Sequence, residues 1–234
     1  MTDISKIDEF PLSDGRSFGY HAAKLGLGLG DLVIPGFGYL LQLGAGKLAG
    51  DPLQERRVKW LISVGQGLKE LQERFDGFDP SALGDNEDFL SAVYEATEAS
   101  MKTHKAFKRE ALKNTVLNAA VNFTVDDALR GRFMSCIDYF TEKHVRVLEV
   151  LSNPGGYDSC VSKAKHMMGA QMHVIRAEIP EAEIDNNVFN IIISDLSREG
   201  MFEGSLNMMV SSSALLAKRS TAVGDAFLRF IQAP

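Results

Sequence analysis

The last quarter of this chain carries the pattern that most limits its fold. From residue 184 onward, apolar residues recur at the spacing of an α-helix, and Gly200 predicts the left-handed turn that ends this helix. Residues 205–211 have the apolar character of a strand, and Thr221 can cap a closing helix. The expected core-facing stripe of the first helix consists of Val188, Ile191, Ile192 and Leu196.

The order of a helix, a short β-ribbon and a closing helix resembles the end of a winged-helix domain. Domains of this shape bind either DNA or protein, so the resemblance alone does not decide a function. Binding to DNA phosphates needs Lys or Arg, but acidic residues outnumber Arg198 in and around the helix. The predicted wing adds only Lys218 and Arg219 as contacts. We therefore expect this unit to pack on the rest of the chain or on another protein, with nucleic-acid binding as the disfavoured alternative.

The bulk composition is that of a folded protein with a sizeable core. Apolar residues make up 45% of the 234 residues and charged residues 24%, and the net charge is −6. Cys136 and Cys160 are too few for a disulfide framework, and the acidic N-terminus lacks the order of a secretory signal. These features favour a cytoplasmic protein.

Helical periodicity dominates the middle of the chain. The sequence predicts helices over about 52–75, from a cap at Asn86 to about 120, from a cap at Thr124 to 151, and over about 157–177. The breaker S-N-P-G-G at 152–156 is the predicted domain boundary. The expected fold class is mainly α. It combines a loose arm with a glycine-rich segment (1–50), an antiparallel bundle of long helices (51–151), and a small winged-helix-like α+β unit (157–234).

A glycine-rich apolar segment occupies residues 24–50. Between Lys24 and Lys47 its only charge is Asp31. Its length suits a bilayer span, but Pro35 and the glycines interrupt a helix, and Asp31 costs roughly 2.5–3.5 kcal/mol near a bilayer centre. Two interpretations stay open: a buried or groove-lining segment, or contact with the inner face of a membrane. The residues expected to make that contact are Leu32, Val33, Ile34, Phe37, Leu40 and Leu41.

No motif in the sequence predicts catalysis, a cofactor or a metal. Gly26, Gly28 and Gly30 lack the spacing and the strand–helix frame of a dinucleotide site, and Lys47 is not followed by Ser or Thr as in a P-loop. Histidines and cysteines show no ligand-spaced pair such as C-x-x-C or H-x-x-x-H. We therefore expect a protein without enzymatic activity, and no small-molecule substrate is identified.

Two further features could serve partners. A basic cluster on the second predicted helix could contact a protein or an anion, although a solvated face paired with Glu98 and Glu110 is the ordinary explanation. Its members are Lys102, Lys105, Lys108, Arg109 and Lys113. The methionines of 166–173, with Met208 and Met209, form either an adaptable apolar surface or, as we expect, fillers of a helical core.

Two passages together are similar to uncharacterised bacterial all-helical proteins. The first is E-A-T-E-A-S-M-K-T-H-K-A-F-K-R-E-A-L-K-N-T-V-L-N-A (95–119), and the second is D-L-S-R-E-G-M-F (195–202) with T-A-V-G-D-A-F-L-R-F-I (221–231). The second resembles the winged-helix-like ending of some of these proteins. Certain proteins of this kind are linked to abortive infection, the sacrificial defence of bacteria against phage. The resemblance transfers no catalytic residue, and it implies a glycine-rich apolar segment before the bundle, suited to an effector that contacts a membrane.

These observations predict a non-enzymatic cytoplasmic bacterial protein that acts through protein contacts or self-association, with phage defence implied by the resemblance. One alternative is an effector that engages the inner face of the membrane through residues 25–46. The other is a winged-helix regulator that binds DNA.

Overall fold

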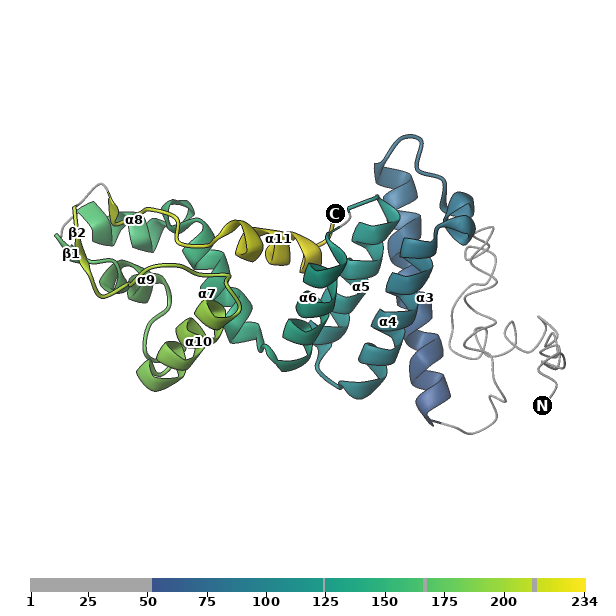
Figure 1. Cartoon of the computed structure of the whole chain (residues 1–234), viewed down its shortest axis with the longest axis horizontal. Helices are drawn as coiled ribbons and strands as arrows, with labels where there is room; N and C mark the ends of the chain where they lie inside the picture. The colour runs from purple at the N-terminus through teal and green to yellow at the C-terminus, as the bar shows by residue number, and fades with distance from the viewer. Residues whose placement is uncertain (1–51, 124, 166–167, 212–213) are drawn as a thin grey trace, which may run out of the picture. The chain divides into compact units, whose positions relative to one another are not determined.

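The computed structural model describes residues 52–123, 125–165, 168–211 and 214–234. These residues are mainly helical, as the sequence predicts, and carry one two-stranded sheet (Figure 1). The α-helices are α3 (Pro52–Arg74), α4 (Glu87–Lys102), α5 (Ala106–Ala120), α6 (Asp127–Tyr139), α7 (Glu142–Ser152), α8 (Asp158–Lys165), α9 (Met172–Glu178), α10 (Asn186–Arg198) and α11 (Ala222–Ile231). The remaining elements are the 3₁₀ helices η2 (Pro80–Asp85) and η3 (Pro154–Gly156) and the strands β1 (Gly169–Ala170) and β2 (Met209–Val210).

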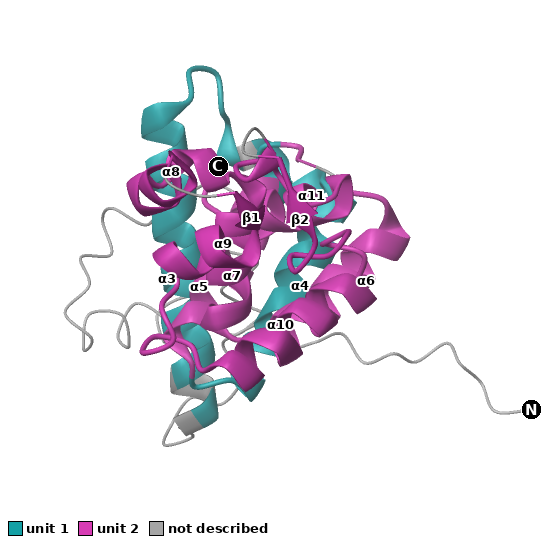
Figure 2. Cartoon of the chain, turned by 90° about the vertical axis from the view of Figure 1, so that its left-hand side faces the viewer, with its two compact units in different colours: residues 1–104, 119–121 teal, residues 105–118, 122–234 magenta. Residues whose placement is uncertain are grey.

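The chain divides into two compact units, coloured separately in Figure 2. The first comprises residues 1–104 with 119–121, and the second comprises residues 105–118 with 122–234. The breaker at 152–156, predicted as a domain boundary, falls inside the second unit. There it forms the end of α7 and η3, and η3 packs against α8.

The first unit is built from α3, η2 and α4, which pack on one another. The predicted cap of α4 is confirmed, because the Asn86 side chain accepts a hydrogen bond from the Phe89 N–H at 3.0 Å. An ion pair between Arg57 and Glu98, 2.9 Å, links α3 to α4 on their exposed side. The apolar side chains in the middle of α3, among them Trp60 and Leu68, are buried, whereas Leu53 near its start and Phe75 just after its end are exposed.

Three predicted helices are shorter than expected. α4 ends at Lys102 because Thr103 adopts extended backbone angles, and α6 ends because Phe140 does the same. Neither break contains Gly or Pro, and the apolar periodicity of the sequence runs across both. The sequence therefore predicted one continuous helix in each place. Asp126, whose side chain accepts from the Ala128 N–H, caps α6; Thr124 lies outside the described residues. The predicted helix over 157–177 is interrupted by β1.

An aromatic cluster lies at the centre of the second unit, where α6 and α11 meet. The Phe133 ring centroid lies 5.4 Å from that of Phe227 and 5.4 Å from that of Phe230. Phe140 meets Phe227 edge-to-face at 5.6 Å. All four rings are buried, and edge-to-face pairs of this kind add to the stabilisation from apolar burial.

The predicted ends of α10 and α11 are confirmed. Gly200 has a φ of +69°, the left-handed conformation that ends α10, and the Thr221 hydroxyl accepts from the Gly224 N–H at 3.1 Å to cap α11. Two amides of α5 hold the other end of α11. Asn114 donates to the Ile231 carbonyl at 2.9 Å. The Asn118 amide nitrogen lies 2.8 to 3.2 Å from the carbonyls of Arg229, Phe230 and Gln232.

The predicted stripe of α10 is half wrong. Ile192 and Leu196 are buried as expected, together with Phe189, which the prediction left out. Val188 is 38% exposed and Ile191 is 59% exposed. One side of α10 therefore packs against the core, and a neighbouring side exposes the branched apolar residues Val188 and Ile191 to solvent.

The β-ribbon is shorter than the strand predicted over 205–211. Ala170 pairs with Met209 and Gly169 with Val210 in antiparallel register. Met168, Met208 and Met209 are 79%, 65% and 78% exposed. The expectation that the methionines fill a helical core is therefore wrong for these three.

Candidate functional site

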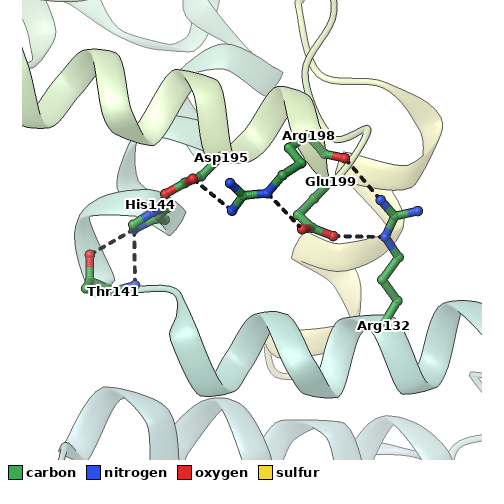
Figure 3. A network of polar contacts seen from close by, with 6 residues as sticks. All are labelled: Arg132, Thr141, His144, Asp195, Arg198 and Glu199. Carbon is green, nitrogen blue, oxygen red and sulfur yellow. Dashed lines mark hydrogen bonds and ion pairs between the residues drawn. The ribbon is translucent and has the colours of Figure 1, made fainter.

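A polar network joins α6, α7 and α10 inside the second unit (Figure 3). At its centre is His144 in the first turn of α7. The Thr141 N–H donates to His144 Nδ1 at 3.1 Å, and His144 Nε2 lies 3.2 Å from Asp195 Oδ2. Since Nδ1 accepts, the proton of the neutral ring sits on Nε2 and is donated to Asp195. His144 thus joins the start of α7 to the last turns of α10.

The network continues along α10 through alternating charges. Asp195 pairs with Arg198 at 2.9 Å. Glu199 accepts from Arg132 Nε of α6 at 2.9 Å, and Arg132 also donates to the Arg198 carbonyl at 3.2 Å. The C-terminal end of α10 is therefore fixed to α6 as well as α7, and the arginine at the carbonyl is favourable for the helix dipole.

Burial sets the protonation of this network. Desolvation lowers the pKa of His144, whose ring stacks on Phe140 with centroids 4.6 Å apart, although Asp195 acts in the opposite direction. A hydrogen bond from Tyr139, and then Arg132, lower the pKa of Glu199. Near neutral pH these shifts favour a neutral His144 and an ionised Glu199, which is the state that their hydrogen bonds require.

The order carboxylate, imidazole, hydroxyl invites comparison with a catalytic triad, because Thr141 Oγ1 lies 2.9 Å from His144 Nδ1. In a triad the free lone pair of the imidazole takes the hydroxyl proton. Here the same lone pair accepts from the Thr141 backbone N–H. This bond belongs to a capping box between Thr141 and His144, with His in the position usual for Glu or Gln. The arrangement is a structural clamp on α7 and α10.

The clamp predicts a pH-dependent stability. Because burial lowers the pKa of His144 in the folded state, the unfolded chain binds the proton more tightly. We expect the free energy of unfolding to fall as the pH drops below about 6.5 and the loss to end once folded His144 is protonated. In His144→Gln the amide can still accept from Thr141, but this titration is gone.

The measurement is urea unfolding of wild type and His144→Gln at several pH values between about 8 and about 5, which bracket the histidine pKa. The stability difference between the two proteins should shift in favour of the variant as the pH falls. His173→Gln, at an exposed histidine, is the matched control and should show no such shift. A pH-independent difference for His144→Gln would contradict the assignment of the clamp.

The predicted basic cluster does not lie on one helix. Lys102 ends α4 in the first unit, Lys105 lies in the break before α5, and Lys108, Arg109 and Lys113 are on α5. Lys108 donates to the Asp138 carbonyl, and Lys113 pairs with Glu110 at 2.7 Å. The cluster is thus partly used for contacts within the second unit.

The two predicted wing contacts are also engaged internally. Lys218 forms an ion pair with Asp225. Arg219 Nε donates to the side-chain oxygen of Gln171 at 2.6 Å, and Gln171 in turn donates to the Ala217 carbonyl at 2.6 Å. Gln171 is fully buried, so Arg219 serves to hold this loop against the start of α9.

The predicted membrane contacts, Leu32 to Leu41, lie outside the described residues. Within the ranges that are described, no helix is both long and apolar enough to cross a bilayer. The same ranges contain no group of three or more His, Cys, Asp or Glu side chains placed to hold a metal ion. Cys136 is buried, and burial raises the pKa of its thiol to about 11.

Sequence reasoning missed the functional candidate that the structure does show, the exposed side of α10. Val188 and Ile191 share this side with Asp195, which follows Ile191 by about one helical turn. From Asn186 to Ser194 the helix carries no charged residue, and Asn187, Asn190 and Ser194 are exposed. The signal in the sequence was Phe189, a larger apolar residue that competes for the core.

The chain matches no protein-family model, and no curated protein or solved structure is significantly similar to it.

Proposed function

We propose that the protein acts through protein contacts and that the exposed side of α10 is the contact surface, with a second copy of the chain as its occupant. The observation that carries this proposal is the exposure of Val188 and Ile191 on a helix that the core holds from another side and that the clamp holds near its C-terminal end. Anchored helices position apolar contact residues with little loss of conformational entropy on binding.

Asp195, the charged residue that shares this side of α10, is already paired with Arg198 and His144, which favours a second copy over other occupants. A two-fold dimer places the same surface opposite itself, so like charges would repel, whereas Asn and Ser side chains can pair with one another. The first two turns of α10 offer Asn187 beside the apolar pair and no charge. DNA phosphates would need cations here, and Lys218 and Arg219 already have partners inside the unit.

The order of elements supports a winged-helix-like assignment for the C-terminal unit. α10 would be the third helix of such a domain, and the bridge between Phe202 and Ser220 would be the base of its wing. α11 would be the closing helix. We propose that this unit uses its third helix for protein rather than DNA, and that the preceding helices form the bundle predicted from the sequence.

The resemblance of residues 95–119, 195–202 and 221–231 to bacterial abortive-infection proteins supports a non-enzymatic role inside a bacterial cell, in phage defence. The alternatives are a membrane effector that uses residues 25–46 and a DNA-binding regulator. A DNA-binding regulator would be retained on DNA in a salt-sensitive way, and this retention would weaken when Lys218 and Arg219 are changed to Glu.

Ile191→Glu should weaken self-association at least about 100-fold, because the dimer loses the burial of two Ile side chains, one from each copy, at about 1.5–3 kcal/mol each. The measurement is sedimentation equilibrium over a range of protein concentrations. Asn190→Glu is the matched control. It adds the same charge to the same helix on another exposed side, about 100° per residue around the axis. A wild-type chain that stays monomeric, or equal effects of the two variants, would contradict the proposal.

A further inference from the structure

The β1–β2 ribbon presents an apolar side that nothing in the described residues covers. Met209 stands opposite Ala170, and side chains on one strand alternate between faces. Met168, two positions before Ala170, therefore lies on the same face as Met209, in the diagonal arrangement that long side chains can bridge. Met208 is exposed next to them. Two flexible thioether side chains thus share one face of the ribbon, and a third, that of Met208, is exposed at the preceding position.

The two sequence segments that contain the strands carry only positive charge, although the chain as a whole has a net charge of −6. Residues 159–177 and 204–224, which include both strands, contain no Asp or Glu. Their cations are Lys163, Lys165, Arg176, Lys218 and Arg219.

Two of these cations are available to an external partner. Arg176, Lys218 and Arg219 bond to Asn186, Asp225 and Gln171, respectively. Lys163 and Lys165, in the last turn of α8, are exposed and form no ion pair within the part of the chain that the structure describes. Lys165 precedes Met168 by three positions, so its charge is the nearer of the two to the apolar side along the chain.

We propose that this ribbon binds an anionic membrane surface, with its methionines in the interface between headgroups and acyl chains and Lys163 and Lys165 on the lipid phosphates. Apolar side chains flanked by Lys are what an interfacial contact requires, since burial and charge act together. DNA phosphates would use the lysines and leave the exposed methionines without a role.

The ribbon is held in place for such a contact. The Met172 N–H donates to the Leu206 carbonyl at 2.9 Å, and buried Gln171 bonds to Ala217 and Arg219 on the returning chain. The methionines project from this anchored base, so their insertion needs no rearrangement of the core.

The test is co-sedimentation of the full chain with vesicles of phosphatidylcholine alone and of phosphatidylcholine mixed with phosphatidylglycerol. We expect binding only to the mixed vesicles, and weaker binding at high salt. Lys163→Glu with Lys165→Glu should reduce the partition coefficient at least about fivefold for each lysine. Met168→Asp with Met209→Asp should abolish binding. Lys143→Glu, an exposed lysine on α7, is the matched control and should bind as wild type.

Two results would overturn the proposal. The first is that the wild-type chain does not bind the anionic vesicles, whether or not it binds duplex DNA instead. The other is equal binding by the ribbon variants, which would place the contact elsewhere, such as residues 25–46. The substituted side chains are exposed, so melting curves should match the wild type. Ile191→Glu should bind vesicles normally, which separates this proposal from that of self-association.

Discussion

Gly224→Ala is expected to destabilise the second unit by about 1–3 kcal/mol or more, although alanine is the better helix former. Gly224 lies in α11 against the backbone that follows α10. A Cβ atom there would stand 2.4 Å from the Met201 carbonyl oxygen and 3.3 Å from Leu148 Cδ1. Cβ atoms do not approach a backbone oxygen this closely, so α11 would have to move away from its core partners.

Gly131→Ala is the matched control for this substitution. Gly131 lies in α6, and a Cβ atom there would meet nothing within 4 Å. Alanine should therefore stabilise the protein by about 0.4–1 kcal/mol through helix propensity and the lower entropy of the unfolded chain. Thermal unfolding followed by circular dichroism should give melting shifts of opposite sign for the two variants. Shifts of the same sign would show that α11 does not pack on Met201 as closely as described.

Phe133→Ala is expected to cost about 3–5 kcal/mol, the range for removal of a buried aromatic ring. Phe133 is fully buried between Phe227 and Phe230 of α11, so its loss opens a cavity where α6 meets α11. Chemical denaturation measures this cost.

Tyr94→Ala provides the comparison for Phe133→Ala, because Tyr94 is a large aromatic residue that is mostly exposed. Its removal should change the stability by no more than about 0.5 kcal/mol. Similar losses for both variants would mean that the aromatic cluster does not dominate the core of the second unit.

Local signals in the sequence predicted the helix ends that depend on one residue. Asn86 and Thr221 cap helices because their side chains reach N–H groups three positions on, and Gly200 ends a helix through its own backbone freedom. Each of these effects acts within one turn of helix, so the position of the helix end can be predicted from the local sequence. The breaks at Thr103 and Phe140 carry no such signal, and tertiary packing decides them.

The candidate surface and the clamp depended on contacts that sequence spacing does not contain. His144 meets Asp195, and Arg132 meets Glu199, from helices far apart along the chain. The side of α10 that faces the core was mispredicted because Val188, Phe189, Ile191 and Ile192 are all apolar, and two stripes fit equally well. Packing of Phe189 beneath Arg176, 4.8 Å from the ring centroid, chooses between them.

The amide bonds from α5 to α11 have a consequence for synthesis of the chain. The carbonyls that accept hydrogen bonds from Asn114 and Asn118 lie more than a hundred positions later in the sequence. Until α11 has left the ribosome, Phe133 lacks its contacts with Phe227 and Phe230 and these amides lack their acceptors, so the nascent second unit exposes apolar surface to chaperones and proteases. A ribosome stalled before residue 222 would therefore carry an unclosed unit, and the protein becomes resistant to degradation only with the arrival of its closing helix.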